Sequence, residues 1–268
     1  MKAFVIDTTK CNGCYCCQIG CKDEHVGNDW TPYAKSQPEW KHYWGKLNEY
    51  ERGAETHVKV SYVFVPCQHC DDAPCIDACP VEAIYRRNDG LVIIDPIKCT
   101  GCQLCLSSSA CPYGVIYYNE TLNIAQKCTG CAHLLDRGWP IDVPRCMDNC
   151  PTEAILFGEE SSLDLTGTEI LNPEYGLSPR VHYKDLPKRF VAGTVFDPSS
   201  NEVVIGADCS LSGAAGDATV KTNNFGDFWI DGLGKGEFTL TITSNGKTKT
   251  MTGDTTDGDI GFADIALS

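Results

Sequence analysis

The sequence predicts an α+β chain in which repeated cysteine-bearing modules are followed by an all-β sandwich. Of the 18 cysteines, 17 lie in the first 150 of the 268 residues. Cys79, Cys111 and Cys150 are each followed by proline, a short apolar segment and a turn, which indicates internal repetition. From residue 190 onward, short alternating segments are separated by Gly, Asn, Asp and Ser turns, a pattern typical of a sandwich.

Composition and charge exclude several classes of protein. Hydrophobic residues make up 42% of the chain and charged residues 22%, as in ordinary globular proteins. The net charge of -14 argues against nucleic acid or an anionic membrane surface as a partner. We expect no transmembrane segment, because no run of about 18 apolar residues occurs. The N-terminal residues do not resemble a signal peptide, so we expect a cytoplasmic protein.

The cysteines form four sets, each opened by a Cys-x-x-Cys pair. The sets are Cys11, Cys14, Cys17 and Cys21; Cys67, Cys70, Cys75 and Cys79; Cys99, Cys102, Cys105 and Cys111; and Cys128, Cys131, Cys146 and Cys150. Their spacing is close to the run that binds [4Fe–4S] clusters in bacterial ferredoxins, where the fourth cysteine ligates the neighbouring cluster. A disulfide framework seldom clusters in this way, and zinc fingers would add histidines at fixed spacing. Cys16 is out of register, and we interpret it as a buried thiol rather than a ligand.

The first domain is expected to span residues 1–160. Alternation predicts a strand over residues 1–9, which leads into the first set, and another over 58–66, which leads into the second. After Pro80 we expect a short helix, a hairpin turn at residues 88–90 and a strand over 91–94. The unit recurs after Pro112, with a turn near 119–122, and begins again after Pro151. These modules therefore indicate duplicated bacterial-ferredoxin-like units.

Two segments interrupt the cysteine sets. Residues 23–65 form an insertion whose aromatic residues indicate either a satellite core or a docking surface; they are Trp30, Tyr33, Trp40, Tyr43, Trp44 and Tyr50. The fourth set is stretched by a loop, residues 132–145, which a metal site tolerates at small entropic cost. The residues of note in it are His133, Arg137, Trp139 and Arg145. We interpret His133 as a hydrogen-bond donor beside a cluster or a surface residue, with ligation as the alternative.

The C-terminal part divides into a linker and a second domain. Residues 161–189 are polar and contain three prolines, which predicts a linker that wraps along the first domain. Residues 190–268 resemble the transthyretin-like, carboxypeptidase-regulatory type of sandwich in their order of Gly, Val and Phe positions. This domain shows no catalytic constellation, so we expect it to dock or to stabilise.

With all four sets in view, the chain resembles the four-cluster electron-transfer subunit of the dimethyl sulfoxide reductase family of molybdenum enzymes. The segments that carry the resemblance are GCKDEH, PCQHCDDAPC, CPYGVIYYNE and AQKCTGCAHLLD, which together with the sandwich are similar to the transhydroxylase and catechol dehydroxylase branch. The resemblance implies that each fourth cysteine is exchanged. The implied ligand groups are Cys11, Cys14, Cys17 and Cys150; Cys128, Cys131, Cys146 and Cys21; Cys67, Cys70, Cys75 and Cys111; and Cys99, Cys102, Cys105 and Cys79. Five residues rather than three separate Cys105 from Cys111, a departure that could displace the last ligand of that set.

The function implied is electron transfer through four [4Fe–4S] clusters. The clusters would connect an external electron donor or acceptor with a large partner subunit that holds molybdopterin (bis-MGD) and acts on a phenolic substrate by dehydroxylation, hydroxylation or transhydroxylation. We expect this chain to contribute no catalytic residue and no flavin or nicotinamide site. The alternatives are a free-standing polyferredoxin and a structural zinc or disulfide protein.

Overall fold

The computed structural model describes residues 1–54, 56–138 and 143–268, which divide into two compact units. Unit 1 comprises Met1–Glu49 and Tyr62–Leu186, and unit 2 comprises Tyr50–Ser61 and Pro187–Ser268. All four cysteine sets lie in unit 1.

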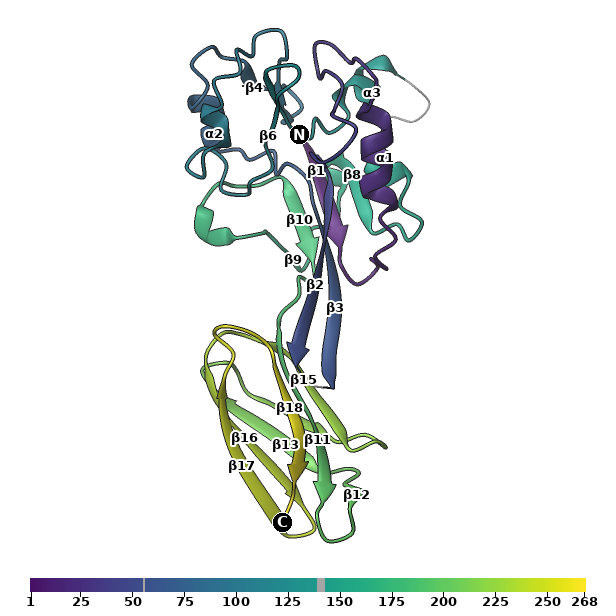
Figure 1. The fold of residues 1–268 in the computed structure, drawn as a ribbon, viewed down its shortest axis with the longest axis vertical. Helices are drawn as coiled ribbons and strands as arrows, with labels where there is room; N and C mark the ends of the chain where they lie inside the picture. The colour runs from purple at the N-terminus through teal and green to yellow at the C-terminus, as the bar shows by residue number, and fades with distance from the viewer. Residues whose placement is uncertain (55, 139–142) are drawn as a thin grey trace. The chain divides into compact units, whose positions relative to one another are not determined.

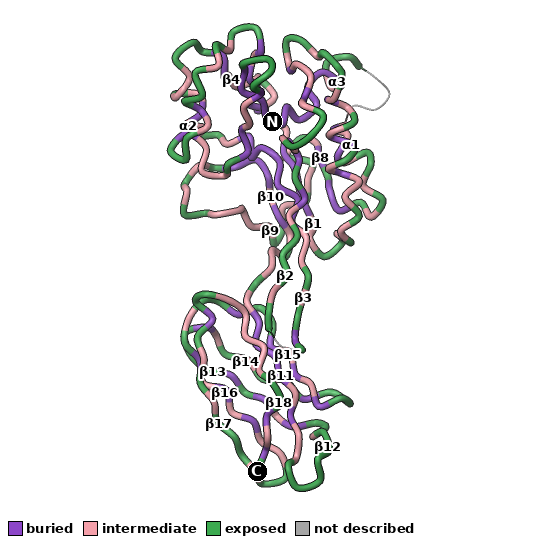
Figure 2. Tube along the Cα trace, in the orientation of Figure 1, coloured by how far each residue is buried: buried purple, intermediate pink, exposed green. Residues whose placement is uncertain are grey.

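A four-stranded sheet forms the centre of unit 1 (Figure 1). Its order is β8 (Ile155–Glu159), β1 (Lys2–Asp7), β10 (Val181–Lys184) and β9 (Thr168–Glu169). The predicted first strand is thus confirmed as β1, which runs antiparallel to β8 and parallel to β10. Four successive residues of β1 are buried, and Figure 2 shows this part of the sheet among the buried regions of the unit.

Two small hairpins lie outside this sheet. In the first, β4 (Ile84–Arg86) pairs with β5 (Val92–Ile94), so the predicted turn and second strand are confirmed. The helix expected after Pro80 is wrong, because residues 84–86 are extended and pair with β5. In the second, β6 (Tyr117–Asn119) pairs with β7 (Ile124–Gln126) around the predicted turn. The strand after each Cys-Pro therefore pairs with a strand that leads into a cysteine set, and β8 with β1 follows the same rule.

The α-helices of unit 1 are short, and each carries a cysteine or directly follows one. They are α1 (Cys16–His25), α2 (Pro74–Asp77), α3 (Ala132–Arg137) and α4 (Arg145–Asp148), with 3₁₀ turns η1 (Leu104–Leu106), η2 (Glu160–Ser162) and η3 (Pro173–Tyr175). Helix α1 packs against α4. The sequence did not predict α1, because cysteine spacing masks its helical period.

Two expected boundaries differ from the structure. The segment 161–189, predicted as a linker, contributes β9 and β10 to the central sheet of unit 1. The insertion 23–65 contains the hairpin β2 (Lys46–Ala54) and β3 (His57–Val65), whose tip, Tyr50–Ser61, belongs to unit 2. Strand β3 confirms the strand expected over 58–66.

Unit 2 contains two four-stranded sheets whose apolar residues share one core. One sheet joins β11 (Arg189–Asp197) to β12 (Glu202–Val203), β15 (Asp227–Leu233) and β18 (Ile260–Ala266). The other has the order β14 (Ala218–Lys221), β13 (Asp208–Gly213), β16 (Glu237–Ser244) and β17 (Lys247–Asp254). Alternate residues such as Phe238, Leu240 and Ile242 are buried, as a two-layer β packing requires.

Candidate metal centres

Sixteen cysteines gather into four groups in unit 1. Three groups each line one cavity: site A has Cys11, Cys14, Cys17 and Cys150; site C has Cys67, Cys70, Cys75 and Cys111; and site D has Cys79, Cys99, Cys102 and Cys105. The cavities, including their mouths, enclose about 370, 360 and 300 Å³ in that order. The remaining group, site B, has Cys21, Cys128, Cys131 and Cys146, which are all buried and lie close enough for a charge on one sulfur to raise the pKa of another. Each group takes three thiols from one set and the fourth from another.

Short helical turns explain why the fourth thiol is exchanged. Helix α1 carries Cys17 of site A and, one turn later, Cys21 of site B, so the two side chains lie on one face. Helix α4 carries Cys146 of site B and is followed by Cys150 of site A. The same relation holds for Cys75 in α2, which is followed by Cys79 of site D.

A left-handed residue shapes the loop that opens each set. The third residue of each Cys-x-x-Cys has positive φ: 73° at Gly13, 46° at His69, 73° at Gly101 and 60° at Gly130. This conformation turns the backbone N–H toward the first cysteine, as in the 3.5 Å contact from His69 N to Cys67 Sγ and the 3.4 Å contact from Gly130 N to Cys128 Sγ. Glycine adopts positive φ readily, whereas His69 does so with a side chain.

The Cys-Pro endings repeat a second hydrogen-bonded turn. The N–H of Ala83 lies 3.3 Å from Cys79 Sγ, and the N–H of Ala154 lies 3.3 Å from Cys150 Sγ. The preceding residues, Glu82 and Glu153, have nearly equal positive φ values of 52° and 53°. Sulfur atoms at these positions thus accept backbone hydrogen bonds.

The thiols lie in an apolar setting that suits a bound metal better than free thiolates. Burial raises the pKa of Cys17, Cys70, Cys105 and Cys131 to about 12. In Cys150 burial has the same effect, but hydrogen bonds from Thr152 and Ala154 outweigh it and lower the pKa. A buried thiolate needs positive charge beside it, and metal binding supplies this charge while releasing the protons. Four thiols around each of the cavities of sites A, C and D, with backbone donors to sulfur, fit a [4Fe–4S] cluster.

Three polar residues beside the sites were missed by sequence reasoning. Lys127 is 2% exposed and its Nζ donates to the backbone oxygens of Val92 and Cys128. His69 lines site C, and His25 places Nε2 4.0 Å from Cys131 Sγ of site B. Their positions within or next to cysteine motifs are the signal that could have drawn attention to them.

The structure contradicts one of the environments expected for His133. It is 3% exposed, so it is not a surface residue, and its Nε2 lies 2.9 Å from Glu24 Oε1. Glu24 also accepts from Arg145 Nε at 2.6 Å. The histidine that contacts Cys131 Sγ is His25, and the sequence position of His25 did not indicate this contact. Trp139, noted in the same loop, lies outside the described residues.

The aromatic insertion contains both environments that the sequence left open. Trp44 is 1% exposed and packs against His25, with ring centroids 4.6 Å apart, as part of the core of unit 1. Trp40, by contrast, is 73% exposed. The core interpretation therefore holds for Trp44, and the docking surface stays a prediction.

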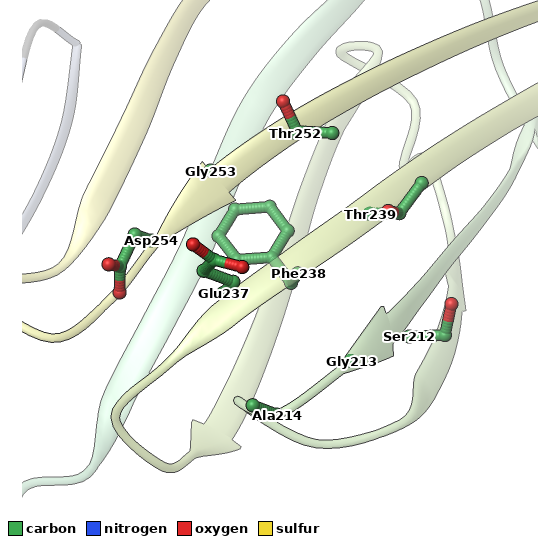
Figure 3. A pocket seen from close by; sticks show the side chains of 9 residues that line it. All are labelled: Ser212, Gly213, Ala214, Glu237, Phe238, Thr239, Thr252, Gly253 and Asp254. Carbon is green, nitrogen blue, oxygen red and sulfur yellow. The ribbon is translucent and has the colours of Figure 1, made fainter.

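Unit 2 has a groove of its own. About 1000 Å³ of open space lies against β13, β16 and β17, where Figure 3 shows the Phe238 ring with the carboxylates of Glu237 and Asp254 beside it. None of its lining residues is a cysteine or histidine.

Among the described residues, no helix combines the length and the apolar character needed to cross a membrane.

Comparisons with known proteins find relatives for both parts of the chain. A family model for a 4Fe-4S dicluster domain matches residues 58–160, and one for a carboxypeptidase regulatory-like domain matches residues 191–268. The chain is 39% identical over 272 residues to the pyrogallol hydroxytransferase small subunit of Pelobacter acidigallici, with 97% of each chain covered.

More distant relatives match a smaller share of the chain. A tetrathionate reductase subunit of Salmonella typhimurium is 32% identical over 70% of this chain and 74% of its own. One of the chains of the anaerobic dimethyl sulfoxide reductase of Escherichia coli is 36% identical over 58% of this chain and 72% of its own. The chain thus belongs to the iron–sulfur subunits of the dimethyl sulfoxide reductase family of molybdenum enzymes, in the branch of the pyrogallol hydroxytransferase small subunit.

Proposed function

We propose that this chain holds four [4Fe–4S] clusters, one in each of sites A to D, and passes electrons between an external redox partner and a molybdopterin-containing catalytic subunit. The observation that carries the proposal is the grouping of 16 thiols into four sets of four within one unit. Bound clusters would supply one-electron redox chemistry, and the protein supplies their ligands, spacing and surroundings.

The proximity of thiols from different groups supports a linear order of sites. Cys17 of site A lies close enough to Cys21 and Cys146 of site B for a negative charge on its sulfur to raise the pKa of both. Site B adjoins site C through Cys128, which receives a hydrogen bond from the backbone N–H of Cys67. Site C adjoins site D, because the charge of Cys75 acts on Cys105. The order A, B, C, D follows.

The two end sites reach the surface. Cys14 of site A and Cys102 of site D are both exposed, whereas every thiol of site B is buried. Two apolar residues near Cys102 in the sequence, Leu104 and Ile97, are 54% and 70% exposed. Electrons would therefore enter at one end site and leave at the other, each facing a protein partner.

A complete set of ligands favours a net redox reaction in the partner. Transfer of a hydroxyl group between two phenols needs no net electrons, whereas reductive dehydroxylation or hydroxylation of a ring does. Four ligand sets with all 16 thiols present therefore favour dehydroxylation or hydroxylation of a phenolic substrate. Which chain binds that substrate follows from the family: the catalytic subunit would do so.

Anaerobic purification at native abundance tests the proposal. We expect iron and acid-labile sulfide in amounts that match four clusters, together with a large co-eluting subunit that contains molybdenum or tungsten. A partner-free chain with iron and sulfide would instead support the free-standing electron carrier. A preparation without sulfide would contradict both and favour a zinc or disulfide protein.

The partner's reaction can then be measured with and without an artificial electron donor. A requirement for the donor would support dehydroxylation, and a requirement for an acceptor would support hydroxylation. Activity that needs neither would indicate transhydroxylation. The cytoplasmic location expected from the sequence stays a prediction.

A further inference from the structure

His69 occupies a position in site C that glycine occupies in the other three sites. It is 1% exposed, adopts a φ of 46° and forms part of the cavity wall. The ring of Phe4 lies nearly parallel to it at 12°, with centroids 6.4 Å apart. A left-handed backbone conformation is energetically unfavourable for a residue with a bulky side chain. We therefore expect the side chain of His69 to make an interaction that compensates for this strain.

The hydrogen bonds of His69 define its tautomer. Its Nδ1 accepts a hydrogen bond from the backbone N–H of Val92 at 3.0 Å, so that nitrogen carries no proton. The neutral ring must then carry its proton on Nε2. Among the described residues, Nε2 is buried and has no hydrogen-bond partner. A buried donor without an acceptor is unfavourable, and the wall in which the ring lies encloses the space among four thiols.

Lys127 binds the same residue as His69, namely Val92. Its Nζ donates to the backbone oxygen of Val92, while the N–H of Val92 donates to His69. Lys127 also lines site C, and it directly precedes Cys128 of site B. Within the described residues no carboxylate lies within ion-pair distance of this buried cation. A buried charge needs a partner, and the anionic clusters proposed for sites B and C would provide it.

We propose that His69 and Lys127, joined through Val92, are positioning residues that raise the reduction potential of the cluster in site C. His69 Nε2 donates a hydrogen bond to a cluster or cysteine sulfur, and Lys127 supplies positive charge that sites B and C share. Reduction adds one electron and one negative charge to the cluster. Hydrogen bonds to sulfur and nearby positive charge both stabilise that reduced form. The inference rests on the proposed function, because it requires a cluster in site C.

Redox titration of the anaerobically purified protein with its partner, followed by electron paramagnetic resonance, tests the proposal. The site C signal is identified as the one perturbed by Cys75→Ala, and the site B signal as the one perturbed by Cys146→Ala. We expect His69→Phe to shift the site C midpoint to a more negative potential and to leave site B unchanged. Lys127→Met should shift both midpoints in the same direction, and Lys127→Arg should restore them.

Matched variants separate this role from a structural one. His25→Phe makes the same change of ring near Cys131 of site B and should leave the site C midpoint unchanged. His69→Gln keeps an N–H donor and should shift site C less than His69→Phe. Iron and sulfide are counted in every variant. An unchanged site C midpoint in His69→Phe with full iron content would overturn the proposal and leave the four-cluster assignment intact.

A second measurement covers the case in which His69→Phe loses its cluster. In the parent protein labelled with ¹⁵N-histidine, pulsed electron paramagnetic resonance on the site C signal should detect histidine nitrogen coupling. Absence of that coupling would overturn the proposal without any variant. Parent protein without iron or sulfide would instead contradict the proposed function itself.

Discussion

Cys17 lines the cavity of site A, whereas its neighbour Cys16 directs its thiol toward that of Cys14. Both residues belong to α1 and are consecutive in the chain. Cys17→Ala should therefore remove the site A cluster signal and its iron, because one of four ligands is lost. The measurement is iron content and electron paramagnetic resonance of the reduced protein. Cys16→Ala is the matched control, and loss of a cluster there would show that the first set has been assigned in the wrong register.

Exchange of the fourth ligand can be tested with paired substitutions. Cys79 and Cys99 line the same cavity, although they come from different sequence sets. The double variant Cys79→Ala/Cys99→Ala should perturb one cluster signal, because both ligands serve site D. Cys67→Ala/Cys79→Ala should perturb two, since sites C and D each lose one ligand. The opposite result would mean that each set keeps its own fourth cysteine.

Two features of the structure favour glycine at position 101, its backbone conformation and the atoms next to it. Its φ is 73°, and a Cβ there would collide with the backbone oxygen of Asn123. Gly101→Ala should therefore reduce cluster occupancy in site D and lower stability by more than the roughly 1–2 kcal/mol of left-handed strain alone. The readouts are iron content and the midpoint of denaturant unfolding. Gly176→Ala, where φ is 64° and no atom lies within 4 Å of the added Cβ, measures the strain by itself. Equal losses in the two variants would contradict the collision.

Unfolding of unit 2 should be separable from loss of the clusters in unit 1. Leu240 is fully buried there, so Leu240→Ala should cost about 2–5 kcal/mol through lost burial and a residual cavity. Circular dichroism should show an earlier β-sheet transition, while visible absorbance of the clusters keeps its midpoint. Val203→Ala, at a position 44% exposed, is the control and should change stability by less than about 0.5 kcal/mol. Parallel loss of absorbance would show that the two units unfold together.

The Arg87–Asp136 ion pair predicts a pH dependence. Both Arg87 Nη atoms lie 2.8 Å from the carboxylate, and this hydrogen bonding lowers the pKa of Asp136 to about 2. The stabilisation is thus fully present above the ordinary pKa near 3.9 and is lost only as pH falls through about 2. Because the Asp136 side chain is 41% exposed, solvent screening limits the coupling to roughly 0.5–1 kcal/mol.

A double-mutant cycle measures this coupling. The variants Arg87→Met, Asp136→Asn and their combination should give the same coupling energy at pH 8 and pH 5, from denaturant unfolding. Tyr33→Phe removes the neighbouring hydroxyl that also binds Asp136 and should leave the pH response in place. A coupling near zero at pH 8 would mean that Asp136 keeps its ordinary pKa in the folded protein, because a pair that does not stabilise the carboxylate cannot lower its pKa.

Sequence patterns predicted the parts of unit 1 that depend on local signals. The turn between Arg86 and Val92 follows from Asp89-Gly90, and alternation identified β1 and β3. The helix expected after Pro80 failed because Ala83 N–H bonds to Cys79 Sγ, which turns the chain into an extended strand. Cysteine sulfur as a hydrogen-bond acceptor carries no periodic signal. Helix α1 was missed for another reason, because its cysteine spacing masks the helical period.

Long-range pairing accounts for the other differences. Val181 and Tyr183 become buried because β10 lies parallel to β1, some 177 residues earlier, and no local pattern reveals such a partner. Polar composition and prolines made that segment look like a linker. Similarly, Lys127 and His69 form one polar arrangement with Val92 only after three separate segments meet.

Unit 2 is assembled from two distant stretches of chain, and this arrangement sets an order for its folding during synthesis. The hairpin tip at Tyr50–Ser61 emerges early, yet Arg52 binds Asp259, 207 residues later. Until Asp259 has been synthesised, the hairpin tip cannot form its contacts with the rest of unit 2. The thiols of unit 1 are synthesised earlier and are already available to bind metal. Contacts so distant in sequence close slowly. Insertion of clusters can therefore precede completion of unit 2, which would make the final strand β18 the last step of maturation.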